Sequence, residues 1–212
     1  GTIPAEQLDT YVARILTLKG RFGLLDSEGR VDPAAVRGTI DDAAINALAT
    51  EAAGRATLLL RDRTGALPIA RSAKVLVVEQ SMFLDRFCND EYFHPYSFWK
   101  ILRGVCPEAD LVRLGFTGAS ADLEEAAERA READVVVATN WYNRGAAPNT
   151  PFVEKLIAAT DRPVAVVTNT PYELSATEAM DCVLCVFSEF VPSLRAAAGI
   201  LYGDAEALGT VG

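Results

Sequence analysis

The sequence is poor in the residues that build metal sites, disulfide scaffolds and nucleic-acid interfaces. Its single histidine, His94, excludes any metal site built on a pair of histidines. Four cysteines are too few for a disulfide scaffold in 212 residues. Lysine and arginine number 20 against 29 acidic residues, which argues against a partner with a phosphate backbone. No apolar run approaches the ~20 residues of a membrane-spanning helix, so we expect neither a nucleic-acid nor a membrane partner.

Two common motifs of catalysis and cofactor binding are also absent. Without a Gly-x-Ser-x-Gly turn, a triad of serine, His94 and aspartate is not indicated. Segment 115–120 could cradle a phosphate at the start of a helix, but it lacks the Gly-x-Gly-x-x-Gly spacing of dinucleotide-binding loops. Ser120 is explained well enough as a helix N-cap. We expect no cofactor, and a flavodoxin-like nucleotide-binding domain stays open as an alternative.

Cys182 and Cys185 have the spacing of a metal or redox motif, but they lie in an apolar run of strand length, 182–187. On a strand, residues three positions apart point to opposite faces, so the two thiols cannot share a metal or a disulfide. We predict buried structural thiols and no metal. Reduced thiols favour a cytoplasmic location. Because the chain opens with Gly1 rather than Met, we expect a processed chain or a piece of a longer protein, which leaves an upstream export signal open.

The amino-terminal part is predicted to consist of two helices joined by a linker. Apolar residues recur every three or four positions from Pro4 to Phe22, which predicts an amphipathic helix. The polar, turn-rich stretch 26–40 is predicted to be the linker. A second helix is predicted over 41–55, where alanine, isoleucine and leucine share one face.

From residue 57 onward, short runs of Val, Leu and Ile alternate with helical patterns. Several of these runs have no polar alternation, which is typical of strands covered on both faces. The predicted strands are 57–60, 74–78, 110–114, 134–138, 163–168 and 182–187. The predicted helices are 92–104, 121–133, 151–160 and 192–201. The alternation predicts an α/β fold, a three-layer αβα sandwich around a mostly parallel sheet of about six strands.

Ligands of an open parallel sheet bind outside the carboxyl ends of its strands, so the loops there are the candidate sites. The first such loop contains the only histidine, and the others present aromatic and amide side chains. The candidate substrate-binding or domain-interface residues in these loops are His94, Asn140, Trp141, Tyr142 and Tyr172.

Four segments, in order along the chain, resemble family 3 glycoside hydrolases. Segment 14–26 (RILTLKGRFGLLD) resembles the helix that closes the catalytic barrel of that family and leads into its second domain. Segment 49–69 is similar to its helix, Leu-Leu strand, turn and Leu-Pro. Segment 163–174 (PVAVVTNTPYEL) resembles its Val-rich strand followed by Pro-Tyr, and segment 193–203 resembles its last helix, which ends in Leu-Phe-Gly. The resemblance covers about 14–203.

The resemblance implies an α/β sandwich packed beside a catalytic barrel. Residues 1–25 would then be the closing helix of that barrel, 26–40 a linker and 41–212 the sandwich. The family hydrolyses β-glycosides with retention, and its nucleophilic aspartate lies on the barrel, upstream of this chain. In the β-glucosidase-like branch, the acid is a glutamate on a loop of the sandwich. The loop that corresponds to it here, 139–150, contains neither Asp nor Glu.

This departure fits better the β-N-acetylhexosaminidase-like branch, in which a His/Asp pair on a barrel loop transfers the proton. The resemblance therefore implies a supporting domain with no catalytic residue of its own. Its implied partners are the preceding barrel and a β-linked amino sugar. The alternative from the binding class is a free-standing domain that recognises a sugar or peptide through its loop aromatics.

The loops 80–98, 139–150 and 169–173 are then expected to face the barrel and to form an aromatic, partly apolar surface. His94 and Trp141 are expected to reach toward a sugar bound in the barrel. The aromatic residues concentrated in these loops are Phe83, Phe87, Tyr92, Phe93, Tyr96, Trp141, Tyr142 and Tyr172.

Overall fold

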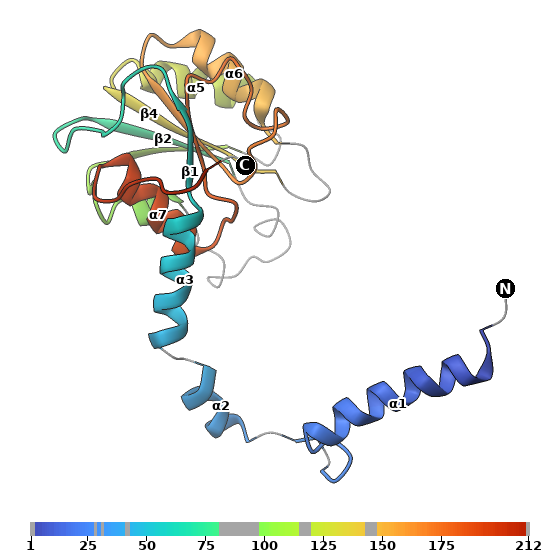
Figure 1. The fold of residues 1–212 in the computed structure, drawn as a ribbon. Coiled ribbons are helices and arrows are strands. Elements are labelled where there is room, and N and C mark those ends of the chain that lie inside the picture. The colour runs from blue at the N-terminus through green and yellow to red at the C-terminus, as the bar shows by residue number, and fades with distance from the viewer. Residues whose placement is uncertain are drawn as a thin grey trace. The chain divides into compact units, whose positions relative to one another are not determined.

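The computed structural model describes residues 3–27, 29–30, 32–40, 43–80, 98–114, 120–142 and 148–210. The chain divides into two compact units, Gly1–Ile45 and Asn46–Gly212 (Figure 1). None of the helices in the described ranges combines the length and the apolar character needed to cross a membrane.

The first unit contains α1 (Ala5–Arg21), where the amphipathic helix was expected, and α2 (Pro33–Ile40). No residue of α1 is buried within the chain. Helix α2 lies inside the stretch 26–40, where we expected a linker. The Oδ1 atom of Asp32 accepts a hydrogen bond from the backbone N of Ala34 at 2.9 Å, and Pro33 occupies the first helical position. The Asp-Pro pair therefore starts a helix within a polar stretch.

Helix α3 (Ala43–Ala56) leads directly into a six-stranded sheet of order β1-β6-β5-β4-β2-β3. Neighbouring strands from β6 to β3 run parallel, and β1 pairs antiparallel with β6. This confirms the predicted α/β fold with a mostly parallel sheet of about six strands. The strands are β1 (Leu58–Asp62), β2 (Val75–Gln80), β3 (Asp110–Leu114), β4 (Val135–Asn140), β5 (Val164–Thr168) and β6 (Cys182–Cys185).

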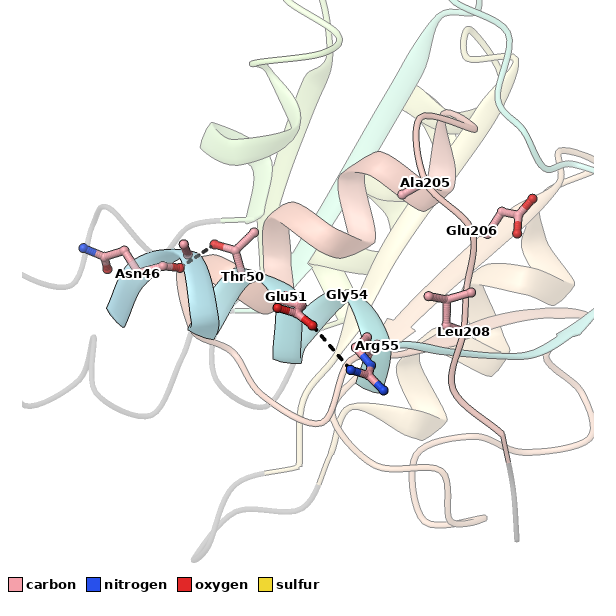
Figure 2. Close-up of a pocket in the computed structure, with 9 residues that line it drawn as sticks. Asn46, Thr50, Glu51, Gly54, Arg55, Ala205, Glu206 and Leu208 are labelled. Atoms are coloured by element: carbon pink, nitrogen blue, oxygen red, sulfur yellow. Dashed lines mark hydrogen bonds and ion pairs between the residues drawn. The ribbon is translucent and has the colours of Figure 1, made fainter. Parts of the chain in front are cut away.

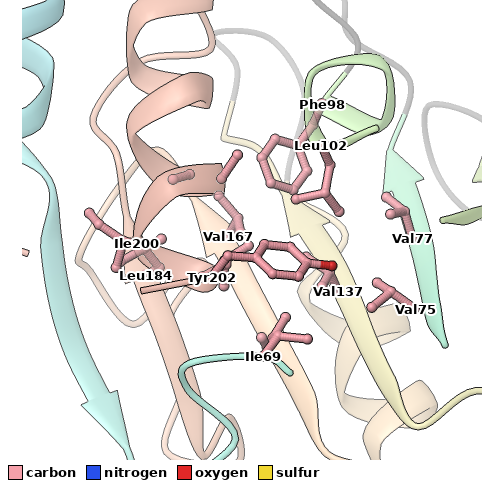
Figure 3. Close-up of a cluster of buried hydrophobic side chains, with 14 of the residues drawn as sticks. Ile69, Val75, Val77, Phe98, Leu102, Val137, Val167, Leu184, Ile200 and Tyr202 are labelled. Atoms are coloured by element: carbon pink, nitrogen blue, oxygen red, sulfur yellow. The ribbon is translucent and has the colours of Figure 1, made fainter. Parts of the chain in front are cut away.

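Helices cover both faces of the sheet and complete the three layers (Figure 1). On one face, α4 (Phe98–Leu102) and α7 (Val191–Leu201) pack on the odd-numbered residues of β2, β4 and β5 (Figure 3). On the other face, α5 (Ser120–Ala130) and α6 (Thr150–Ala159) pack on the even-numbered residues. Strands β2, β4, β5 and β6 are buried along their whole length, which explains their continuous apolar sequences.

Cys182 and Cys185 lie on opposite faces of β6, as their spacing predicts. Cys182 belongs to the core on the α4 and α7 side together with Leu184, whereas Val183 belongs to the core on the other side. Both thiols are free and buried, and Cys106 is free and buried as well. Burial raises the pKa of Cys185 to about 11. Burial, together with the nearby Asp62 carboxylate, raises the pKa of Cys182 to about 12.

Trp141, which we expected to reach outward, is instead a core residue. Its side chain is 2% exposed and packs in the cluster beneath α4 and α7. Its backbone N also donates to the Oε1 atom of the buried Gln80 at 2.8 Å, so main chain and side chain are both fixed. Tyr172, in contrast, is 74% exposed.

We expect Trp141→Ala to lower the free energy of unfolding by about 3–5 kcal/mol, because it removes a large buried side chain and leaves a cavity. Tyr172→Ala is the control, and it should change the same quantity by no more than about 0.5 kcal/mol since its side chain contributes little to the core. Urea denaturation followed by far-UV circular dichroism measures both. Equal, small losses for the two variants would contradict the placement of Trp141 in the core.

We also expect Cys182 and Cys185 to resist iodoacetamide in the folded chain at pH 8, because only the thiolate reacts and both thiols stay protonated. Peptide mass mapping should find both alkylated only after denaturation. Because the unfolded thiols ionise above about pH 9 and the folded ones do not, the free energy of unfolding should fall as pH rises above that value. A disulfide linking the two, or fast alkylation of the native chain, would contradict this.

Candidate functional site

The carboxyl ends of β4, β5 and β6 lie side by side in the sheet, and the loops that follow them expose large apolar side chains. Phe190 is 62% exposed, directly before α7, and Tyr172 stands in the loop after β5. Exposed apolar side chains gathered at one edge are typical of a binding surface. The members of this group, called the edge surface from here on, are Tyr142, Tyr172, Leu174, Phe187 and Phe190.

Buried polar groups hold the loop between β5 and β6 in place. The Oγ1 atom of Thr168 donates to the Oγ of Ser175 at 3.0 Å. The Nδ2 atom of Asn140 donates to the carbonyl oxygen of Ser175 at 2.9 Å and to the Oγ1 of Thr150 at 3.0 Å. Thr150 in turn donates to the carbonyl oxygen of Leu174 at 2.6 Å. Because Asn140, Thr168 and Ser175 are removed from water, the bonds among them are costly to break, and the loop that carries Tyr172 is fixed to its neighbours.

The loop after β6 contains a strained residue. Phe187 has a φ of +56°, a left-handed conformation that costs a residue other than glycine about 1–3 kcal/mol. Hydrogen bonds on both sides hold it: the N of Val186 donates to the carbonyl of Thr168 at 2.9 Å, and the N of Phe190 donates to the Oγ of Ser188 at 3.2 Å. Strain of this kind persists only where the surrounding structure enforces it. The side chains of Phe187 and Phe190 in this loop are both exposed.

The last two residues of β2, Glu79 and Gln80, place buried polar side chains at the same edge of the sheet. Gln80 receives a hydrogen bond from the backbone N of Trp141 and donates its own backbone N to the Oγ1 of Thr139, both at 2.8 Å. The Oε1 atom of Glu79 accepts from the backbone N of Phe98 at 2.6 Å, and its Oε2 lies 3.7 Å from Nη2 of Arg113. Glu79 is buried, so it supports the start of α4.

The structure separates the five candidate residues into different roles. His94 lies outside the described residues, as do Phe83, Phe87, Tyr92, Phe93 and Tyr96. Asn140 and Trp141 are buried and contribute to the scaffold beneath the edge. Among the residues that the structure describes, neither the buried Oδ1 atom of Asn140 nor the buried Nδ2 of Asn149 has a hydrogen-bond partner. Tyr142 and Tyr172 are exposed and belong to the edge surface.

Sequence reasoning missed Phe187 and Phe190. It assigned Phe187 to a strand over 182–187, whereas β6 ends at Cys185 and the chain turns at Phe187. A signal was present, because Ser188 lies two residues before Phe190 and Pro192 stands in the first turn of α7, a pattern of a helix start. A helix start after a strand requires a loop, and loop aromatics are candidates for binding.

The opposite edge of the sheet has a different character, since its charges pair with one another. Arg129 forms an ion pair with Asp110, and its hydrogen bond holds the pKa of that carboxyl below the usual value. Glu178 pairs with Arg61 at 3.1 Å and with Arg63 at 2.6 Å. The hydrogen bond from Arg63 and the charges of both arginines lower the pKa of Glu178. This edge is charged, whereas the described loops after β4, β5 and β6 expose apolar and aromatic side chains.

A groove of about 670 Å³ lies between α3 and the carboxyl-terminal segment (Figure 2). Gly209 fixes that segment: its N donates to the carbonyl of Thr57 at 2.9 Å, and a Cβ at Gly209 would lie 2.6 Å from the carbonyl oxygen of Ala56. The charges of Glu51 and Arg55 pair with each other at 3.3 Å, which leaves few polar groups for a ligand. The groove is lined by Asn46, Ala47, Thr50, Glu51, Gly54, Arg55, Ala205, Glu206 and Leu208.

No model of a known protein family matches the sequence, and no curated protein matches it either. Solved structures do match its fold. A family 3 β-N-acetylglucosaminidase from Paenibacillus sp. superposes on 98% of this chain with a TM-score of 0.76 and 20% identity. A β-glucosidase from Listeria innocua in complex with glucose superposes on 96% of it with a TM-score of 0.72 and 20% identity. A fungal multi-domain family 3 β-N-acetylglucosaminidase superposes on 97% of it with a TM-score of 0.70 and 18% identity.

The chain spans only a part of each of these enzymes, 39% of the Paenibacillus enzyme, 31% of the Listeria enzyme and 23% of the fungal one. Nearly all of this chain therefore has a structural counterpart in each, while most of each enzyme has no counterpart in this chain. The chain has the fold of a domain of family 3 glycoside hydrolases.

Proposed function

We propose that this chain is the α/β-sandwich domain of a family 3 glycoside hydrolase of the β-N-acetylhexosaminidase-like branch, and that it supports a catalytic barrel without supplying catalytic groups. The observation that carries the proposal is the fold match over 98% of this chain to 39% of a β-N-acetylglucosaminidase. The 61% of that enzyme without a counterpart leaves room for a complete catalytic domain.

The contrast between the two edges of the sheet supports a partner at the carboxyl edge. The edge surface exposes three aromatic rings and a leucine of neighbouring loops to water together with Tyr142. Buried hydrogen bonds of Asn140 and Thr168 to Ser175 hold the loop that carries Tyr172 and Leu174. Burying such side chains against a partner yields about 25 cal/mol per Å² of apolar area. The amino edge offers mainly charges that are already paired, and solvent-exposed pairs of this kind contribute little to association.

Helix α1 supports the proposal independently. It is the segment that resembles the helix closing the barrel, and no residue of it is buried within its own unit. An isolated helix of 17 residues is only marginally stable in water, so its apolar stripe needs another surface to pack against. A barrel would cover this stripe, whose exposed members are Leu8, Tyr11, Val12, Ile15, Leu16, Leu18 and Phe22.

Two acids at the carboxyl edge, Glu79 and Glu189, already serve the scaffold. Glu79 is buried against the start of α4, and Glu189 accepts a hydrogen bond from Asn169 at 2.6 Å. The loop 139–150 contains no acid at all. A retaining glycosidase needs two carboxyl-type groups about 5 Å apart across the scissile bond, so we assign the chemistry to the barrel. On this reading Tyr142 and Tyr172 contact the barrel or a β-linked amino sugar bound there, and His94 stays a candidate for the same role.

We expect the isolated chain to release no nitrophenol from the p-nitrophenyl β-glycosides of N-acetylglucosamine and glucose, because the nucleophile is not part of it. The natural reading frame that contains this chain should, when expressed in full, hydrolyse the N-acetylglucosamine derivative. Saturable turnover by the isolated chain, lost on mutation of one of its own carboxylates, would contradict the proposal. A reading frame that encodes no barrel would contradict it as well, and would favour the free-standing binding domain.

We expect Phe190→Ser to weaken the association of this chain with the separately produced segment that precedes it in that reading frame. The expected loss is tenfold or more in Kd, about 1.4 kcal/mol, because an exposed aromatic side chain that the partner would bury disappears. Lys155→Ser is the control, since Lys155 is exposed on the outer helix α6 and is not a member of the edge surface. Titration calorimetry measures both. A larger loss for the control would place the docking surface elsewhere.

A further inference from the structure

The carboxamide of Asn169 joins the loops that follow three adjacent strands. The last ladder pair between β4 and β5 is Asn140 with Thr168. Beyond it, the Oδ1 of Asn169 accepts from the backbone N of Tyr142 at 2.8 Å, and its Nδ2 donates to the backbone carbonyl of Tyr142 at 2.8 Å. The side chain thus imitates a peptide group and prolongs the pairing of the two strands by one residue.

The same carboxamide reaches the loop after β6. Its Nδ2 donates to the Oε1 of Glu189 at 2.6 Å, a short bond because the acceptor is a carboxylate. Both hydrogens of Nδ2 are therefore used, one on Tyr142 and one on Glu189. The reverse orientation of the amide would place its oxygen against the Tyr142 carbonyl and the Glu189 carboxylate, so the network itself fixes the orientation.

The two residues that Asn169 holds flank the exposed aromatic side chains. Tyr142 is itself a member of the edge surface. Glu189 lies between Phe187 and Phe190 in the sequence, and both of these aromatic residues are members as well. Glu189 also lies two residues after the left-handed φ of Phe187. A restraint at Glu189 therefore opposes relaxation of the strained turn, and the restraint depends on an amide group at position 169.

We propose that Asn169 is the positioning residue of the edge surface: it orders Tyr142 and the segment 187–190 in the free chain, so that the surface is ready to bind its partner. This rests on the proposed docking function and adds to it the residue that prepares the surface. Preorganised side chains bind more tightly because less conformational freedom is lost on association. A carboxylate at position 169 could not donate to either acceptor, and alanine would remove all three bonds.

The test compares Asn169→Asp and Asn169→Ala with Asn46→Asp, which makes the same change of charge at an exposed residue of α3. Amide hydrogen exchange of the 212-residue chain is measured residue by residue. We expect at least tenfold faster exchange at Phe190 in both Asn169 variants, with exchange in β2, β4 and β5 unchanged. The Phe190 amide bonds to Ser188 and not to Asn169, so loss of one local bond alone would leave it unchanged. Glu189→Gln, which keeps an acceptor oxygen, should stay within threefold of the wild type.

The second measurement is the affinity of the same variants for the separately produced preceding segment. We expect both Asn169 variants to bind at least tenfold more weakly, and Asn46→Asp to bind like the wild type. Exchange at Phe190 within twofold of the wild type, or faster exchange with unchanged affinity, would overturn the proposal. If the wild type itself does not bind, the proposed docking function fails, and the exchange comparison then decides by itself whether Asn169 orders these loops.

Discussion

The burial of a parallel sheet on both faces is the constraint from which the rest of this molecule follows. Strands β2, β4, β5 and β6 are buried from end to end, so neither face of the sheet can meet a partner. The loops where the strands end are therefore the first place to look for a binding surface. The amino edge holds paired charges, and the carboxyl edge holds aromatic side chains on loops that polar groups fix from beneath. The position of the exposed apolar side chains therefore depends on the fold as well as on the sequence.

Local periodicity was sufficient to predict the layers but not the roles of single loop residues. Valine-rich runs of strand length without polar alternation are typical of strands covered on both faces, and all six predicted strands overlap those in the structure. Trp141 illustrates the limit. It follows β4 in a loop, where an aromatic residue is a candidate for binding. The side chain of Gln80 on another strand accepts a hydrogen bond from the backbone of Trp141, and the Trp141 ring packs in the core. That partner is 61 residues away in sequence, and no local pattern reveals it.

Residues of the candidate site could be predicted where a local sequence pattern places them, and could not where a distant contact does. Tyr142 and Tyr172 could be placed at the carboxyl edge because their strands end just before them. Phe187 could not, because whether an apolar run ends at residue 185 or 187 depends on a backbone angle that tertiary contacts enforce. The hydrogen bonds of Asn169, Asn140 and Gln80 join strands distant in sequence, so their meaning appears only once the sheet order is known.

An ordered surface of exposed aromatics is costly for a domain that stays alone, because it gains no stability from those rings and risks association with other molecules. A domain that never separates from its partner avoids this cost, since the partner covers the rings. The uncovered stripe of α1 follows the same logic, because a helix of this length gains its stability from packing rather than from propensity. A large apolar partner joined to this chain would cover both the exposed aromatic side chains and the apolar stripe of α1, and neither would then be costly. The strain at Phe187 needs no partner, because the hydrogen bonds on either side of it enforce the left-handed conformation within this chain.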